Sequence, residues 1–204
     1  MAWKDLTPKT FASIRELNGI SARTQEEHYE LYKGYVAKVN EIQKKLDAVD
    51  RTTANQIFSD LRSLRVDYSF AIGGMKNHEI FFGHLGGKGG APTGKLKEQI
   101  ARDYPSYDAW LADFKASGLA ARGWVWLAYD HDLSMLTTVV GDAQNSFPLW
   151  NATPILALDV YEHAYWLDYG RARAKYIDAF FNNLDWNVVA ANLDRALTMQ
   201  PATK

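Results

Sequence analysis

Residues 155–165 read Ile-Leu-Ala-Leu-Asp-Val-Tyr-Glu-His-Ala-Tyr and mark the passage from an apolar strand to a helix. The short apolar run over 155–160 predicts a buried β-strand. At the junction, Asp159 and His163 lie four residues apart, so a carboxylate and an imidazole can converge on one cation. Short Asp-x-x-x-His matches also arise by chance. The other segments of the chain must therefore decide whether this pair forms a site.

Two long helices are predicted upstream of this segment. Apolar residues at helical spacing predict one helix over residues 24–51 and a second over 54–85. Within the second, Gly73 and Gly74 allow close approach of another backbone or a local kink. The segment 86–94, GGKGGAPTG, is too rich in Gly to continue a helix and predicts an interdomain linker. We therefore predict a domain of two antiparallel helices over residues 1–88.

The rest of the chain, residues 89–204, predicts a mixed α and β domain. The expected elements are a helix over 96–121, a β-hairpin of strands 123–129 and 133–140, a third strand over 155–160, and helices near 176–184 and 188–197. The predicted fold class is α+β, with an N-terminal long antiparallel helical hairpin followed by a C-terminal α/β domain that contains a three-stranded antiparallel sheet.

Composition limits the classes of function. A formal net charge of −1 argues against a chain whose main work is to neutralise nucleic-acid phosphates. The chain has no cysteine, which excludes disulfides, thiolate metal ligands and a Cys nucleophile. Residues 1–14 lack the apolar run of a signal peptide, and 18 consecutive apolar residues occur nowhere. We therefore expect a cytoplasmic protein that does not enter a membrane.

The five histidines are few enough to consider singly. A lone histidine is more often structural or at the surface than a ligand. His28 shares one helix face with Tyr32 and Tyr35, a pattern also typical of an aromatic core stripe. His78 lies on the second, largely apolar helix, where it can equally hydrogen-bond a carbonyl. Neither position identifies a ligand by itself.

Residues 89–96, GGAPTGKL, nearly match the phosphate-binding P-loop. Leu96 has no hydroxyl group for Mg²⁺, and the preceding segment is expected to be helical rather than a strand. The sequence therefore argues against a nucleotide site.

Taken together, these segments resemble the iron/manganese superoxide dismutase family from about residue 24 to 193. The resemblance rests on segments that occur in the family's order, of which Asp-Val-x-Glu-His-Ala-Tyr is the most specific. They are Gly-Tyr-Val at 34–36, Asn77-His78 with Phe81, GGKGGAPTGKL at 86–96, Gly-Trp-Val-Trp-Leu at 123–127, the 159–165 block, and Tyr176-Ile177 through Asp185-Trp186. The resemblance implies the conversion of superoxide to oxygen and hydrogen peroxide by one redox-active ion per subunit.

By the same resemblance, the ion is manganese or iron and its ligands are His28, His78, Asp159 and His163. Gly74 together with Gln144 resembles the manganese arrangement, because iron forms often carry the glutamine on the second helix. This implies a slight preference for manganese.

The resemblance also implies roles around the metal. Tyr35 matches the gateway tyrosine, and Gln144 matches the glutamine that hydrogen-bonds metal-bound solvent. Trp124 and Trp126 match the aromatic wall of the pocket. Glu162 and Tyr165 match residues that reach the site of a neighbouring subunit, so a homo-oligomer, dimer or tetramer, is expected.

Two features depart from the family pattern. His28 and Tyr35 are seven positions apart where eight are usual, and Tyr32 stands near a position where histidine is common. Two alternatives remain at this stage. One is a mononuclear metal hydrolase, which would need an open cleft and a general base, and the other is a non-catalytic metal-binding homologue of the same fold.

Overall fold

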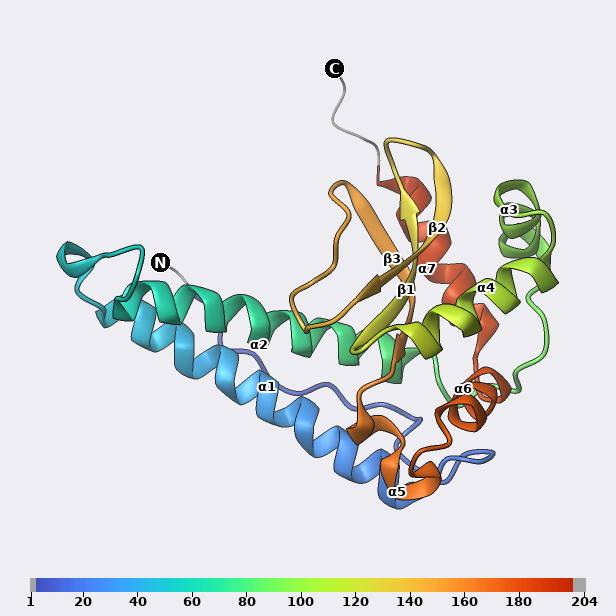
Figure 1. Ribbon diagram of the computed structural model, residues 1–204, viewed down its shortest axis with the longest axis horizontal. Coiled ribbons are helices and arrows are strands. Elements are labelled where there is room, and N and C mark those ends of the chain that lie inside the picture. The colour runs from blue at the N-terminus through green and yellow to red at the C-terminus, as the bar shows by residue number, and fades with distance from the viewer. Residues whose placement is uncertain (1–2, 200–204) are drawn as a thin grey trace.

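The computed structural model describes residues 3–199, and two long antiparallel helices dominate its first half (Figure 1). Helix α1 spans Ala22–Ala48 and helix α2 spans Asp60–Gly83. Helix α1 begins where the Ser21 side chain accepts a hydrogen bond from the Thr24 backbone N–H. Its buried residues follow one face that packs against α2. The predicted helical hairpin is therefore confirmed.

Helix α2 begins six residues later than predicted. The side chain of Asn55 accepts from the backbone N–H of Ile57 at 2.8 Å and so holds this segment in a turn. Ser59 then caps the helix by accepting from the Arg62 N–H. A single 3₁₀ turn, Arg51–Thr53, lies between the two helices.

The single helix predicted over 96–121 is two helices in the structure. Helix α3 spans Gly94–Asp103 and helix α4 spans Tyr107–Ala120. Pro105 separates them, because proline lacks an N–H and disfavours helical geometry at the residue before it. Ser106 then starts α4 by accepting from Ala109 N.

Three antiparallel strands form one sheet, as predicted, and their order is β2-β1-β3. Strand β1 spans Trp124–Asp130, β2 spans Met135–Gly141 and β3 spans Ala152–Asp159. Every residue of the central strand β1 is buried. Helices α2 and α7 contact β3, and α4 contacts β1 and β2, so every strand of the sheet packs against a helix. The last residue of β3 is the aspartate of the Asp-x-x-x-His pair.

The chain after β3 is helical. It forms a 3₁₀ turn, Glu162–Ala164 (η2), and the helices α5 (Trp166–Tyr169), α6 (Arg173–Asn182) and α7 (Trp186–Thr198). None of the helices in the described part of the chain is both long and apolar enough to cross a membrane.

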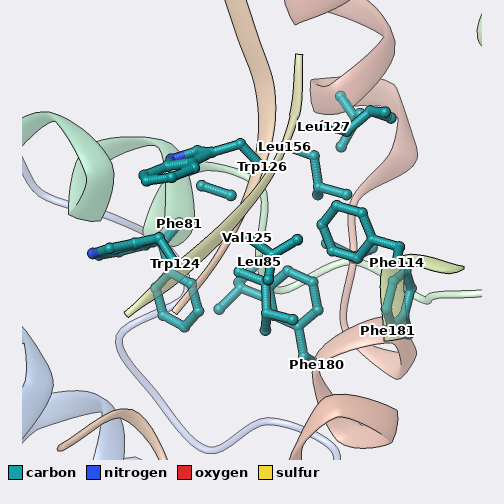
Figure 2. Packing of buried hydrophobic residues seen from close by; sticks show 14 of the residues in the cluster. Phe81, Leu85, Phe114, Trp124, Val125, Trp126, Leu127, Leu156, Phe180 and Phe181 are labelled. Atoms are coloured by element: carbon teal, nitrogen blue, oxygen red, sulfur yellow. The ribbon is translucent and has the colours of Figure 1, made fainter. Parts of the chain in front are cut away.

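One cluster of buried apolar side chains joins both predicted domains. Figure 2 shows Phe81 of α2 beside Trp124 of β1, with Phe180 of α6 nearby. The glycine-rich segment that connects α2 to α3 is also packed: the N–H groups of Gly87 and Gly89 donate to the carbonyls of Asn183 and Leu184. A division near residue 88 stays a prediction, since the two parts share this core.

Candidate metal centre

Four side chains from four segments converge in the interior. They are His28 of α1, His78 of α2, Asp159 at the end of β3 and His163 of η2. One ligand atom from each lies within 4.8 Å of all the others. The Asp159 Oδ2 atom lies 3.1 Å from the Nε2 atoms of His28 and His163 and 3.5 Å from that of His78. The structure thus brings together all four residues proposed as ligands.

Local hydrogen bonds aim these groups at one point. The backbone N–H of Tyr161 donates to Asp159 Oδ1 at 2.9 Å, which leaves Oδ2 to face the imidazoles. The Tyr176 hydroxyl donates to the Asp159 carbonyl at 2.8 Å. On α2, His78 Nδ1 lies 2.6 Å from the Gly74 carbonyl, so that nitrogen carries the proton and Nε2 is free to bind.

Electrostatics favour the metal-binding protonation state of three of these four residues. Burial lowers the pKa of His28, and it lowers the pKa of His78 to about 3, so both imidazoles are neutral at pH 7. Burial opposes ionisation of Asp159, yet His163 and His28 together bring the pKa of its carboxyl well below its usual range. Burial also acts to lower the pKa of His163, but the Asp159 carboxylate outweighs it and raises that pKa. At neutral pH, His163 is therefore the candidate ligand at which a proton competes most with a metal ion.

The residues present fit a metal ion. His78 Nε2 is buried and has no hydrogen-bond partner among the described residues, although it points at the other three ligand atoms. Three neutral imidazoles and one carboxylate suit a redox-active first-row metal. A cation bound among the four ligand atoms would give this nitrogen a partner.

Gln144 and Tyr35 lie beside this cluster. Tyr35 belongs to α1, and Gln144 belongs to the loop between β2 and β3. Gln144 is 2% exposed; its Oε1 accepts from Trp124 Nε1 at 3.0 Å, and its backbone carbonyl accepts from Asn77 Nδ2 at 3.0 Å. The Tyr35 ring centroid lies 5.4 Å from that of His78. Burial and the Asp159 carboxylate raise the pKa of Tyr35, and a hydrogen bond with Gln144 opposes them. The phenol therefore stays protonated at neutral pH.

The two glycines of α2 permit this contact. A Cβ on Gly73 would lie 2.2 Å from the Gln144 carbonyl oxygen, and one on Gly74 would lie 2.7 Å from the Tyr35 ring. Helix α2 continues through both without interruption. Of the two sequence interpretations, close approach of another backbone is confirmed at Gly73, and the local kink stays a prediction.

Aromatic rings surround the cluster. Phe81 and Phe82 lie 5.0 Å and 4.9 Å from His28 between ring centroids, and Trp124 lies 5.2 Å from His78. Tyr161 stacks on His163 at 5.2 Å, a contact that sequence reasoning missed. The stacked ring of Trp126 lies behind Trp124, 6.2 Å from it, and forms an outer layer of this wall.

The residues expected to reach a neighbouring subunit differ in placement. Glu162 is exposed, whereas Tyr165 is only 3% exposed and its hydroxyl accepts from Arg173 Nε at 3.1 Å. The Tyr165 ring stacks on Tyr176 inside the same chain, and the expected reach of Glu162 and Tyr165 to a neighbouring subunit stays a prediction. Trp166, the next residue, is 48% exposed and was missed by sequence reasoning.

The helical hairpin and the C-terminal part of the chain thus each contribute two of the four candidate ligands for a single metal ion. Residues 92–192 match the family model described as iron/manganese superoxide dismutases, C-terminal domain. Superoxide dismutase [Fe] from Aquifex pyrophilus is 42% identical over 98% of this chain and 96% of its own length. The chain belongs to the iron/manganese superoxide dismutase family, and with it to the oxidoreductases.

Relatives named for either metal are similar to the chain. Superoxide dismutase [Fe] from Cupriavidus metallidurans is 37% identical over 89% of this chain and 92% of its own length. Superoxide dismutase [Mn] 2 from Halobacterium salinarum is 42% identical over 60% of this chain and 62% of its own length. These names leave both iron and manganese open for the present chain.

Proposed function

We propose that the protein disproportionates superoxide with one manganese or iron ion held by His28, His78, Asp159 and His163. One superoxide anion gives up an electron and leaves as oxygen, while a second takes up one electron and two protons and leaves as hydrogen peroxide. The observation that carries this proposal is the convergence of three imidazoles and one carboxylate, with the His78 Nε2 atom unpaired among the described residues. When bound, the ion supplies reversible one-electron exchange.

Tyr35 and Gln144 are proposed to supply and steer protons. Tyr35 is half-buried and hydrogen-bonds Gln144, so it links the buried site to solvent. Trp124 Nε1 donates a hydrogen bond to Gln144 Oε1, so the side-chain amide nitrogen of Gln144 is left as the hydrogen-bond donor to Tyr35. A protonated phenol beside an oriented amide can pass its proton inward and take up another from solvent, which restores the neutral phenol.

The aromatic enclosure favours this reaction over a metal hydrolase. Phe81, Phe82, Trp124 and Tyr161 crowd the ligands, which suits a diatomic substrate better than a bulky one. A hydrolase would also need a general base. Asp159 is the carboxylate within the cluster, and it is proposed as a ligand.

Manganese is slightly favoured over iron in this proposal. Gln144 enters the site from the loop after β2, and Gly74 on α2 leaves room for the Tyr35 ring where a side chain would collide with it. This arrangement supports the resemblance to the manganese form. Iron remains part of the proposal because relatives named for iron match over nearly the full chain.

The protein is also proposed to act as a homo-oligomer in the cytoplasm. An open groove of about 580 Å³ lies beside His163, and three of its lining residues are exposed apolar side chains: Leu31, Trp166 and Leu167. In the described part of the chain no group hydrogen-bonds to Nδ1 of His163. A second copy seated on this groove could offer its Glu162 to that nitrogen, as a carboxylate commonly orients a ligand histidine.

The first experiment is superoxide decay by stopped flow on apoprotein reconstituted separately with manganese and with iron. Activity with one metal alone identifies both function and cofactor, and activity with both identifies an enzyme that accepts either. Full occupancy without activity would replace this proposal with the non-catalytic homologue. His163→Ala should abolish stoichiometric metal binding, and retained metal in that variant would contradict the ligand set.

A further inference from the structure

The N-terminal arm, defined here as residues 3–20, lies along α1. Side chains of α1 hydrogen-bond the backbone groups of the arm, as the backbone of a neighbouring strand would in a sheet. Asn40 accepts from the Leu6 backbone N–H and donates to the Leu6 carbonyl, at 2.9 and 2.8 Å. Tyr32 accepts from the N–H of Lys9, and Tyr29 donates to its carbonyl, both at 2.9 Å. Two residues of the arm therefore have both backbone groups paired.

Tyr32 joins the arm to both of the helices that carry histidine ligands. Its side chain is 0% exposed, one turn after His28 on α1. Its hydroxyl accepts from the arm at Lys9 and donates to Glu79 Oε1 on α2 at 3.1 Å. Glu79 directly follows His78 and also pairs with the Lys9 ammonium group. One phenol thus links three segments immediately behind two candidate ligands.

The Tyr32 ring reaches the ligands through Phe82. Its centroid lies 6.3 Å from that of Phe82, whose ring lies 4.9 Å from His28 and 6.1 Å from His78. The arm also holds Phe82 directly, since the Ser13 hydroxyl donates to the Phe82 carbonyl at 2.8 Å. These contacts are buried and close-packed, so a shift of the arm is transmitted to both imidazoles.

We propose that Tyr32 is a positioning residue for the metal centre: its hydroxyl fastens the N-terminal arm and α2 to α1, and so keeps His28 and His78 at the separation that the ion requires. The inference rests on the proposed ligand set. It accounts for the phenol at this position, because the Tyr32 hydroxyl bonds both Lys9 N and Glu79 while its ring packs on Phe82. Residues outside the direct ligands commonly tune affinity in this way.

The test is chelator-driven metal release from purified holoenzyme, with the electron paramagnetic resonance spectrum of the bound ion as a second readout. Tyr32→Phe keeps the ring and removes both hydrogen bonds. We expect metal release to become about 3- to 10-fold faster and the spectrum to shift. Glu79→Leu, which removes the acceptor on α2, should reproduce both changes, whereas Glu79→Gln, which retains an oxygen acceptor, should restore most of the wild-type behaviour.

Asn40→Ala is the matched control, because it releases the arm at Leu6, three turns along α1 from His28. It should lower thermal stability while leaving metal release and the spectrum unchanged. Wild-type metal release in Tyr32→Phe would overturn the inference, and so would equal acceleration in Asn40→Ala. A wild-type protein that holds no stoichiometric metal would contradict the proposed function itself, whereas normal metal binding with an unchanged Tyr32→Phe contradicts only the role of Tyr32.

Discussion

Asp159 shows how single residues build the site. It ends β3, its Oδ1 is held by the Tyr161 N–H, and its Oδ2 faces three imidazoles. The Asp159–His163 pair could be suspected from sequence, because both residues lie within five positions of the chain. His28 could not be assigned by its own neighbours, since its partners come from α2 and β3. The resemblance to a family, rather than local pattern, identified it before the structure.

Tyr35→Phe should retain the metal but lower turnover about 10- to 100-fold, because it removes a protonated phenol hydrogen-bonded to Gln144. Stopped-flow decay of superoxide, with metal content measured on the same sample, checks this. The control is Tyr104→Phe, which loses a hydrogen bond to Thr138 away from the site. Equal turnover in wild type and Tyr35→Phe would remove Tyr35 from the proton path.

His84 should make the protein sensitive to acid. Its side chain is 0% exposed, Nε2 accepts from the Ala157 N–H at 3.1 Å, and burial lowers its pKa to about 3. Below pH 6.5 the unfolded chain takes up a proton that the folded imidazole does not, so stability is complete above pH 6.5 and falls as the pH drops toward 3. The sign follows from the lowered pKa in the folded state.

The measurement is urea unfolding of wild type and His84→Gln at pH 7 and pH 5. Between pH 7 and pH 5, the free energy of unfolding of the wild type should fall by about 2 kcal/mol more than that of the variant. One titrating group contributes about 1.4 kcal/mol per pH unit, and the contribution of His84 changes mainly below about pH 6.5. Identical losses in the two proteins would show that His84 is protonated in the folded state.

At the scale of elements, the helices followed the apolar pattern, and their ends followed local chemistry. Helix α2 begins later than predicted because Asn55 forms a turn and Ser59 caps the helix. The helix predicted over 96–121 is two helices because Pro105 interrupts it and Ser106 caps the second. These signals are present in the sequence, but periodicity alone passes over them. Periodicity also could not explain the glycine at position 73. A larger side chain there would collide with the Gln144 carbonyl, which belongs to a loop distant in the sequence.

Gly73→Ala and Gly34→Ala should have opposite effects although both raise helix propensity. A Cβ added at Gly34 in α1 would meet no atom within 4 Å beyond the adjacent residues and backbone of its own helix, so alanine there should stabilise the fold by about 0.5–1 kcal/mol. At Gly73 the new Cβ meets the Gln144 carbonyl, which must move. We expect lower stability and lower activity, measured by urea unfolding and superoxide decay. Similar gains in both variants would contradict the close approach.

At the scale of the whole molecule, the exposed apolar groove beside His163 is the proposed contact surface between two copies of the chain. Trp166→Glu should dissociate the proposed oligomer, because it places a carboxylate on the apolar surface. The control is Trp150→Glu, since Trp150 is 92% exposed and does not line that groove. Analytical ultracentrifugation should show smaller species only for Trp166→Glu, with reduced activity. Unchanged sedimentation of Trp166→Glu would place the interface elsewhere.

The sequence by itself determined the helical hairpin, the three-stranded sheet and the family, because apolar periodicity and ordered motifs are local properties of the chain. Only the tertiary structure decided which side chains meet. It brought Gln144 against Tyr35, placed Tyr32 between the N-terminal arm and Glu79, and turned Tyr165 inward while leaving Trp166 exposed. The physical reason is that such contacts join residues far apart in the chain, and their geometry depends on how α1, α2 and β3 pack around one buried point.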